Sequence, residues 1–214
     1  MSAESIRPGG AVAELLATPG VEERVVLRGR FGFLAFHAGV EGGTDVVATR
    51  AAEAAGASLY CLVQPPSVRW HLPSHVIGAE ASLRLVAFLD HVDIAVAVHG
   101  YGRPQRPRDL LLGGRNRLLA RELGEALRQT LPDWPIVDDL EAIPREMRGL
   151  HPDNPVNLVR GSGVQLELPP SVRGASGRWV DPNVDCVPEP GLIEALAQVA
   201  TGYRISEQAE RLLS

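Results

Sequence analysis

Short apolar runs bounded by glycine, proline and polar residues recur along the chain and predict β-strands. The run at 92–100, VDIAVAVHG, is almost entirely apolar, as expected of a strand covered on both faces. The first two strands are expected to be joined by a tight turn around Gly29 and Gly32. The predicted strands are 25–30, 31–37, 57–64, 92–100 and 164–169.

Between these runs, apolar residues recur at the spacing of an amphipathic helix. Thr44 suits the N-cap of the first such helix, and Gly56 suits its end. Residues 2–20 are expected to be a loose or partly helical lead-in. Because strands and helices alternate, the chain predicts one α/β domain over residues 1–214, with a mixed central sheet and helices on both faces. The predicted helices are 45–56, 79–90, 115–131 and 190–213.

Composition narrows the class of protein. The 214 residues, 45% hydrophobic and 22% charged, fit one globular domain and exclude a disordered or fibrous chain. The net charge of −5 does not favour binding of nucleic acid. No run approaches the roughly 20 apolar residues that a helix needs to cross a bilayer. Cys61 and Cys186 are isolated, and MSAESIRPGG lacks an apolar signal core. The sequence therefore predicts a cytoplasmic protein, without indicating its oligomeric state.

Two histidines end predicted strands, His37 the strand 31–37 and His99 the strand 92–100. In an open α/β sheet, residues at the carboxyl ends of strands face the crevice that carries the site. Glu41 follows His37 on a glycine-rich turn, HAGVEGG. Catalytic zinc takes three protein ligands from His, Asp and Glu and leaves one position for water. The pattern suggests a Zn²⁺ site of His37, Glu41 and His99; the alternative is that these residues share no task.

Glu167 alternates with Val164, Leu166 and Leu168 in the apolar segment GVQLELP. A carboxylate in such a strand is costly to bury unless it is paired or functional. Either it faces solvent, or it faces the same crevice as the histidines. In the second case it would serve as general base and then general acid for an amide hydrolase.

Several segments, taken in order over roughly residues 33–173, resemble the poly-γ-glutamate hydrolase family of bacteria and phages. The resemblance implies a fold like that of zinc carboxypeptidases and cleavage of γ-glutamyl amide bonds. It also implies that His37, Glu41 and His99 ligate zinc and that Glu167 is the catalytic carboxylate. This chain has one residue fewer between His37 and Glu41 than the family pattern, and Gly43 replaces a proline. The segments are HAGVEGGTDVVATRAA, SLYCLVQ, LPSHV, VAVHGYG, LLLGGRN and LHPDNPVNLVRGSGVQLELPPSVR.

Four further residues are candidates for substrate binding. Asn157 and Arg160, in NPVNLVR, would seat a substrate carboxylate, because a guanidinium binds a carboxylate through two parallel hydrogen bonds. The alternative for Arg160 is that it ties its loop to the sheet. His71 would reach the site as a hydrogen-bonding group or else pack structurally. Tyr101 would close over the substrate or donate to the leaving group, or else be a surface residue.

All 21 basic residues are arginines, and six of them follow His99 within a short stretch. They are interpreted either as a solvated basic face or as a track that steers a carboxylate-rich polymer towards the zinc. A rival hypothesis is a metal-free module that binds an anionic polymer, and a third is a zinc amidase acting on another γ-glutamyl or peptidoglycan-type amide. The six are Arg103, Arg106, Arg108, Arg115, Arg117 and Arg121.

Overall fold

The computed structural model describes residues 10–78, 80, 82–175 and 186–213, and within them it contains a seven-stranded sheet of order β1-β3-β2-β4-β7-β5-β6. Strands β3, β2, β4 and β7 run parallel to one another, whereas β1 pairs antiparallel with β3 and β5 pairs antiparallel with β7. The predicted mixed sheet is confirmed. The strands are β1 Glu22–Val26, β2 Phe31–Ala38, β3 Ser58–Val63, β4 Ile94–Gly100, β5 Leu110–Leu112, β6 Ile136–Val137 and β7 Gly163–Leu168.

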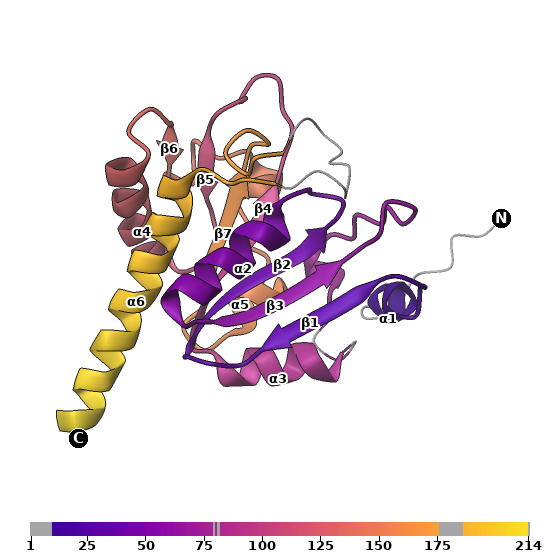
Figure 1. Ribbon diagram of the computed structural model, residues 1–214, viewed down its shortest axis with the longest axis horizontal. Helices are drawn as coiled ribbons and strands as arrows, with labels where there is room; N and C mark the ends of the chain where they lie inside the picture. The colour runs from indigo at the N-terminus through magenta and orange to yellow at the C-terminus, as the bar shows by residue number, and fades with distance from the viewer. Residues whose placement is uncertain (1–9, 79, 81, 176–185, 214) are drawn as a thin grey trace.

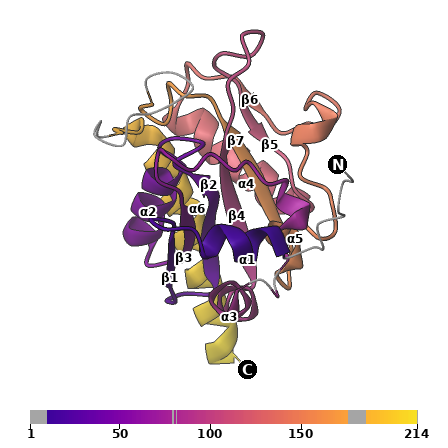
Figure 2. The same cartoon turned by 90° about the vertical axis from the view of Figure 1, so that its right-hand side faces the viewer.

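Helices cover both faces of the sheet, as predicted (Figures 1 and 2). Helices α2, α4 and α6 pack on one face, and α1, α3 and α5 pack on the other. None of the described helices is both long and apolar enough to span a membrane. The helices are α1 Gly10–Leu16, α2 Thr44–Ala55, α3 Leu83–His91, α4 Arg117–Thr130, α5 Pro155–Leu158 and α6 Pro190–Leu213, with short 3₁₀ turns at Ser74–Val76 and Arg145–Met147.

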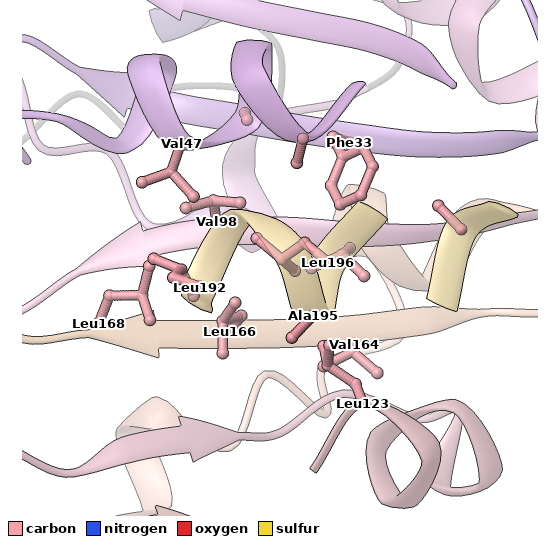
Figure 3. Close-up of a cluster of buried hydrophobic side chains, with 14 of the residues drawn as sticks. Phe33, Val47, Val98, Leu123, Val164, Leu166, Leu168, Leu192, Ala195 and Leu196 are labelled. Carbon is pink, nitrogen blue, oxygen red and sulfur yellow. The ribbon is translucent and has the colours of Figure 1, made fainter. Parts of the chain in front are cut away.

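The central strands are buried on both faces, which explains why their sequences are apolar runs rather than alternating patterns. Along β2, Phe33 belongs to the core under α6, whereas the next residue, Leu34, belongs to the core under α3. Figure 3 shows the larger of these cores, in which Phe33, Val98 and Leu166 surround side chains of α6 such as Leu196. These two cores fix the central strands, and hence the positions of their carboxyl ends.

The first two strands, which were expected to be joined by a tight turn, do not pair with each other. Strand β1 pairs with β3, and β2 lies between β3 and β4. Residues of β2 are buried along its whole length, so it needs a hydrogen-bonded neighbour on each side. Strand β1 alternates between exposed and half-buried residues, which suits the edge of a sheet.

The turn into α2 also differs from the prediction. The N-cap is Gly43, with φ of 82°, and Thr44 is the first helical residue. The Thr44 hydroxyl donates to the Glu41 carbonyl at 2.9 Å, so it stabilises the turn before the helix instead of capping it. Gly56 ends the helix in the left-handed conformation, as predicted.

Candidate metal centre

The carboxyl ends of β2, β4 and β7 lie side by side and carry His37, His99 and Glu167. His99 and Glu167 are register partners in the parallel pair of β4 and β7. All three residues are at most 7% exposed. The structure therefore brings these predicted site residues together at one edge of the sheet, where open α/β sheets carry their sites.

A tight turn after β2 returns Glu41 to the side of His37. The Val40 and Glu41 amides both donate to the His37 carbonyl, at 3.0 and 2.8 Å. Gly39 has φ of 87° and lies against the Gln64 backbone, so a side chain at this position would meet both strain and a collision. The shape of the turn thus depends on glycine, and it leaves the Glu41 carboxylate 3.0 Å from His37 Nδ1.

Three donor atoms converge here. His37 Nδ1 lies 3.3 Å from His99 Nδ1, and His99 Nδ1 lies 3.4 Å from Glu41 Oε2. The other ring nitrogen of His37, Nε2, donates to the Leu72 carbonyl at 2.7 Å, so in the neutral ring the lone pair lies on Nδ1. A backbone carbonyl that fixes the tautomer in this way is typical of metal-ligating histidines. Two imidazole nitrogens and a carboxylate form a donor set that fits a divalent cation such as Zn²⁺.

His71 offers a second ligand set with the same His37–Glu41 pair. Its Nε2 lies 3.0 Å from Glu41 Oε1, and its ring stacks on that of His37 with centroids 4.4 Å apart. The His71 side chain is 59% exposed on an irregular segment, whereas that of His99 is 4% exposed at the end of a central strand. A rigid, buried position holds a ligand more firmly, which favours His99 over His71 as the candidate third ligand.

The charges at the site reinforce one another. Burial opposes ionisation of Glu41, but His37 and His99 overcome this effect and hold the pKa of that carboxyl well below its usual range. Burial likewise disfavours the charged form of His99, yet the neighbouring Glu41 raises the pKa of His99 to about 8. The hydrogen bond from His71 to Glu41 raises the pKa of His71 as well. Glu41 is thus an ionised carboxylate surrounded by imidazoles.

Glu167 has the opposite electrostatic environment. Burial raises the pKa of Glu167, the nearby His99 opposes that shift, and the negative charge of Glu41 adds to it. A chain of amides holds the carboxyl: Asn154 Nδ2 donates to Gln165 Oε1, and Gln165 Nε2 donates to Glu167 Oε1, both at 2.8 Å. Glu167 is therefore oriented and suited to bind and release a proton, which is the requirement for a general base.

A cavity of about 560 Å³ opens over these groups, and a substrate of several residues could enter it. Its lining includes His37, Glu41, His99 and Glu167, together with Arg103 and Arg145.

The predicted substrate-binding residues lie in different places. His71 and Tyr101 line the cavity. The Tyr101 hydroxyl lies 2.8 and 2.6 Å from the carbonyls of Arg106 and Asp109, so it anchors its own loop, and no leaving group is needed to satisfy it. The Asn157 amide forms hydrogen bonds with backbone atoms of Gly149, His151 and Arg115. These bonds hold a loop that forms part of the cavity wall.

The structure does not bring Arg160 to the site. Its Nη1 lies 3.2 Å from Asp93 Oδ1, and Asp93 precedes β4 at the end opposite to His99. The side chain is 77% exposed. Arg160 therefore ties its loop to the sheet, and it lies away from the cavity that would bind a substrate carboxylate.

The six arginines that follow His99 do not form one surface at the site. Arg103 alone among them lines the cavity, where it pairs with Glu146 at 2.6 Å. Arg106 pairs with Asp109, Arg108 lies over the Trp134 ring, and Arg117 donates to backbone carbonyls.

Three site residues are absent from the sequence-based prediction. Gln165 and Asn154 form the amide chain to Glu167, and Arg173 is a buried arginine against Gly100. A signal for Gln165 was present, because it is a polar residue two positions before Glu167 and so shares its face of the strand. Arg173 follows two prolines and a short turn, and its burial has no periodic signature in the sequence.

The fold and site define an α/β protein that carries a His–Glu–His donor set and a buried carboxyl at the carboxyl edge of a mixed sheet. The family model for poly-γ-glutamate hydrolase matches residues 13–176, which is most of the chain. The chain therefore belongs to the poly-γ-glutamate hydrolase family, as its segments indicated, and family membership makes it a hydrolase of amide bonds.

Solved structures share the fold of this chain. A bacteriophage poly-γ-glutamate hydrolase superposes with a TM-score of 0.74 at 26% identity, covering 89% of this chain and 93% of that one. The zinc-free apo form of YNDL shares the fold with a TM-score of 0.68 at 20% identity, covering 88% and 90%. The gene product Atu2144 from Agrobacterium tumefaciens gives 0.53 at 12% identity, covering 88% and 95%. No curated protein matches the chain.

Proposed function

We propose that the protein is a zinc-dependent hydrolase that cleaves γ-glutamyl amide bonds in poly-γ-glutamate or a related carboxylate-rich chain. Family membership supports the bond and the polymer. The observation that carries the proposal is the convergence of His37 Nδ1, His99 Nδ1 and the Glu41 carboxylate within 3.4 Å of one another, beside a buried Glu167.

His37, Glu41 and His99 would hold the ion. Bound zinc supplies Lewis acidity, which polarises a carbonyl group and lowers the pKa of water towards roughly 7. The Gly100 amide donates to Glu41 Oε2 at 2.9 Å, so the ligand carboxylate is oriented by the strand that also carries His99. The Leu72 carbonyl orients the His37 ring in the same way.

Glu167 would move the proton. Gln165 occupies Glu167 Oε1, so Oε2 is the oxygen that can take a proton from the attacking water. The same oxygen would then deliver that proton to the amide nitrogen as the carbon–nitrogen bond breaks, giving a free amine and a carboxylate. Burial raises the pKa of the Glu167 carboxyl, which makes it a better base for taking up the proton.

The test is hydrolysis of purified poly-γ-glutamate, followed by size-exclusion chromatography and by assay of released amines. Protein loaded with zinc is expected to shorten the polymer, protein stripped by a chelator is expected to be inactive, and zinc added back is expected to restore the rate. An α-linked polyglutamate of equal length serves as the matched substrate and should remain intact. Zinc-loaded protein that leaves the γ-linked polymer intact would overturn the proposal, and polymer binding without cleavage would favour the binding-module hypothesis.

A further inference from the structure

Arg173 is a buried cation beside the candidate metal centre. It is 3% exposed, and it lies five residues after the end of β7. Its guanidinium lies against the Cα of Gly100, since a Cβ at that glycine would come within 2.6 Å of Arg173 Cζ. Gly100 directly follows His99, so the guanidinium is held next to the ligand-bearing end of β4.

The Arg173 charge has no carboxylate partner within ion-pair distance among the described residues. Burial lowers the pKa of the guanidinium, and the nearby Glu41 opposes that shift from beyond 4 Å. A buried charge without a partner is destabilising, and proteins retain one where it meets a ligand or completes a network. Arg173 completes no network in the part of the chain that the structure describes.

One edge of the Arg173 fork has no hydrogen-bond partner on its Nε atom among the described atoms. Nη1 donates to the Gly42 carbonyl, which fixes the group. Nε is buried and has no hydrogen-bond partner among the described atoms. Nε and Nη2 form the edge of a guanidinium that receives a carboxylate through two parallel hydrogen bonds. The hydrogen bond to Gly42 therefore uses Nη1 and leaves the Nε of the carboxylate-binding edge buried and unpaired.

Arg173 also lines a second cavity, of about 420 Å³, that adjoins the first. The two cavities share Glu41, His71, Gly100, Tyr101 and Arg103 in their linings. A chain with a scissile amide over His37, Glu41 and His99 would therefore have a neighbouring group within reach of Arg173.

From this geometry we infer that Arg173 and the second cavity form a carboxylate subsite, which receives an α-carboxylate of the γ-glutamyl chain next to the scissile amide. The inference rests on the proposed function for the identity of the chain. It assigns to Arg173 the task that the sequence suggested for Arg160. A γ-linked glutamyl chain carries one free α-carboxylate per residue, so a subsite at fixed spacing from the scissile bond would select γ-linked chains.

The experiment compares two synthetic γ-glutamyl oligomers of equal length, one with free α-carboxylates and one with α-carboxamides. Wild-type protein, Arg173→Met, Arg173→Lys and the control Arg160→Met are assayed for kcat and KM, and their zinc content and melting temperature are measured. For the carboxylate oligomer, Arg173→Met is expected to raise KM by about tenfold to a hundredfold with kcat nearly unchanged. For the carboxamide oligomer, wild type and Arg173→Met should behave alike.

Arg173→Lys keeps the charge, so it still tests the subsite if Arg173→Met fails to fold. It is expected to raise KM for the carboxylate oligomer severalfold, because an ammonium group cannot form the bidentate pair. Equal losses on both oligomers, a fall in kcat alone, or no change in either variant would overturn the subsite. If wild type cleaves neither oligomer, the proposed function fails, and calorimetric binding then decides the subsite: weaker binding of the carboxylate oligomer by Arg173→Met supports it, and equal binding overturns it.

Discussion

His99 and Glu167 face each other as register partners on the adjacent parallel strands β4 and β7. The backbone ladder between these strands therefore fixes a candidate metal ligand and a candidate general base relative to one another. Both side chains are buried, and the cores on the two faces of the sheet hold their strands in place. Groups carried by strands of a packed sheet are positioned more accurately than groups on loops.

Replacing Glu167 with glutamine should separate catalysis from metal binding. Glu167→Gln keeps the shape of the side chain but removes the group that takes the proton, so the hydrolytic rate should fall by roughly 10²–10⁴-fold. Zinc content, measured by elemental analysis, should stay at the wild-type value. Glu125→Gln, on the exposed face of α4, is the matched control and should keep full rate. A Glu167→Gln protein that binds zinc and keeps its full rate would remove Glu167 from the mechanism.

The amide chain from Asn154 through Gln165 should act on Glu167. Gln165→Leu has a similar volume but leaves Asn154 Nδ2 and Glu167 Oε1 without their 2.8 Å partners. Losing one buried polar partner typically costs about 1–3 kcal/mol, so urea denaturation should show a loss of stability in that range. Steady-state assays should show a lower kcat, of the order of tenfold, with KM little changed. The exposed Gln129→Leu is the control, and a drop in stability with unchanged kcat would make Gln165 purely structural.

Two ligand sets share His37 and Glu41, and single substitutions distinguish them. His71→Ala removes a half-exposed side chain beside the centre, so the protein should retain about one zinc per chain. His99→Ala removes the buried nitrogen and should lower zinc affinity strongly. Competition with a zinc-binding dye measures both. The reverse order of affinities would place His71 in the ligand set.

The Asp93 cluster predicts a dependence of stability on pH at the far end of β4. The Arg30 guanidinium donates to both oxygens of Asp93, at 3.1 and 2.7 Å, and lowers the pKa of that carboxyl, with a further contribution from Arg160. A carboxyl with a lowered folded-state pKa stabilises the protein above its unfolded pKa, about 3.9, and this contribution is lost as the pH falls through the folded value.

Asp93→Asn should therefore be less stable than wild type by about 1 kcal/mol at pH 7, and the difference should shrink below about pH 4. Urea denaturation at several pH values measures it, with the exposed Asp90→Asn as the control. A difference that does not vary with pH would show that the contribution is not electrostatic.

Much of the fold follows from local patterns. The apolar run ending at His99 and the segment around Glu167 predicted two strands, and the rule that open sheets carry their sites at carboxyl ends placed His99 at the crevice. For Glu167 the sequence left two orientations open, towards the crevice or towards solvent, and the register of β4 with β7 places it beside His99. The pairing of β1 with β3 could not be predicted from local patterns, because it depends on which strands are available at the edge of the sheet. Which strands pair there is determined by packing between segments that are distant in sequence.

The site was predicted in part for the same reason. His37, Glu41 and His99 are marked by strand ends and a glycine-rich turn, which are local features. Arg160 and Arg173 are equivalent in a sequence that contains only arginine as its basic residue, yet one is 77% exposed and the other is buried at 3%. Only the packing of the segment after β7 against Gly42 and Gly100 distinguishes them.

Whether His37, Glu41 and His99 hold zinc is measured by elemental analysis. The protein would be purified without chelators and without a His-tag, beside a His37→Ala/His99→Ala double variant. About one zinc per chain is expected in the wild type and none in the double variant, with both proteins folded by circular dichroism. Wild-type protein that contains no zinc, and takes up none on titration, would contradict this expectation.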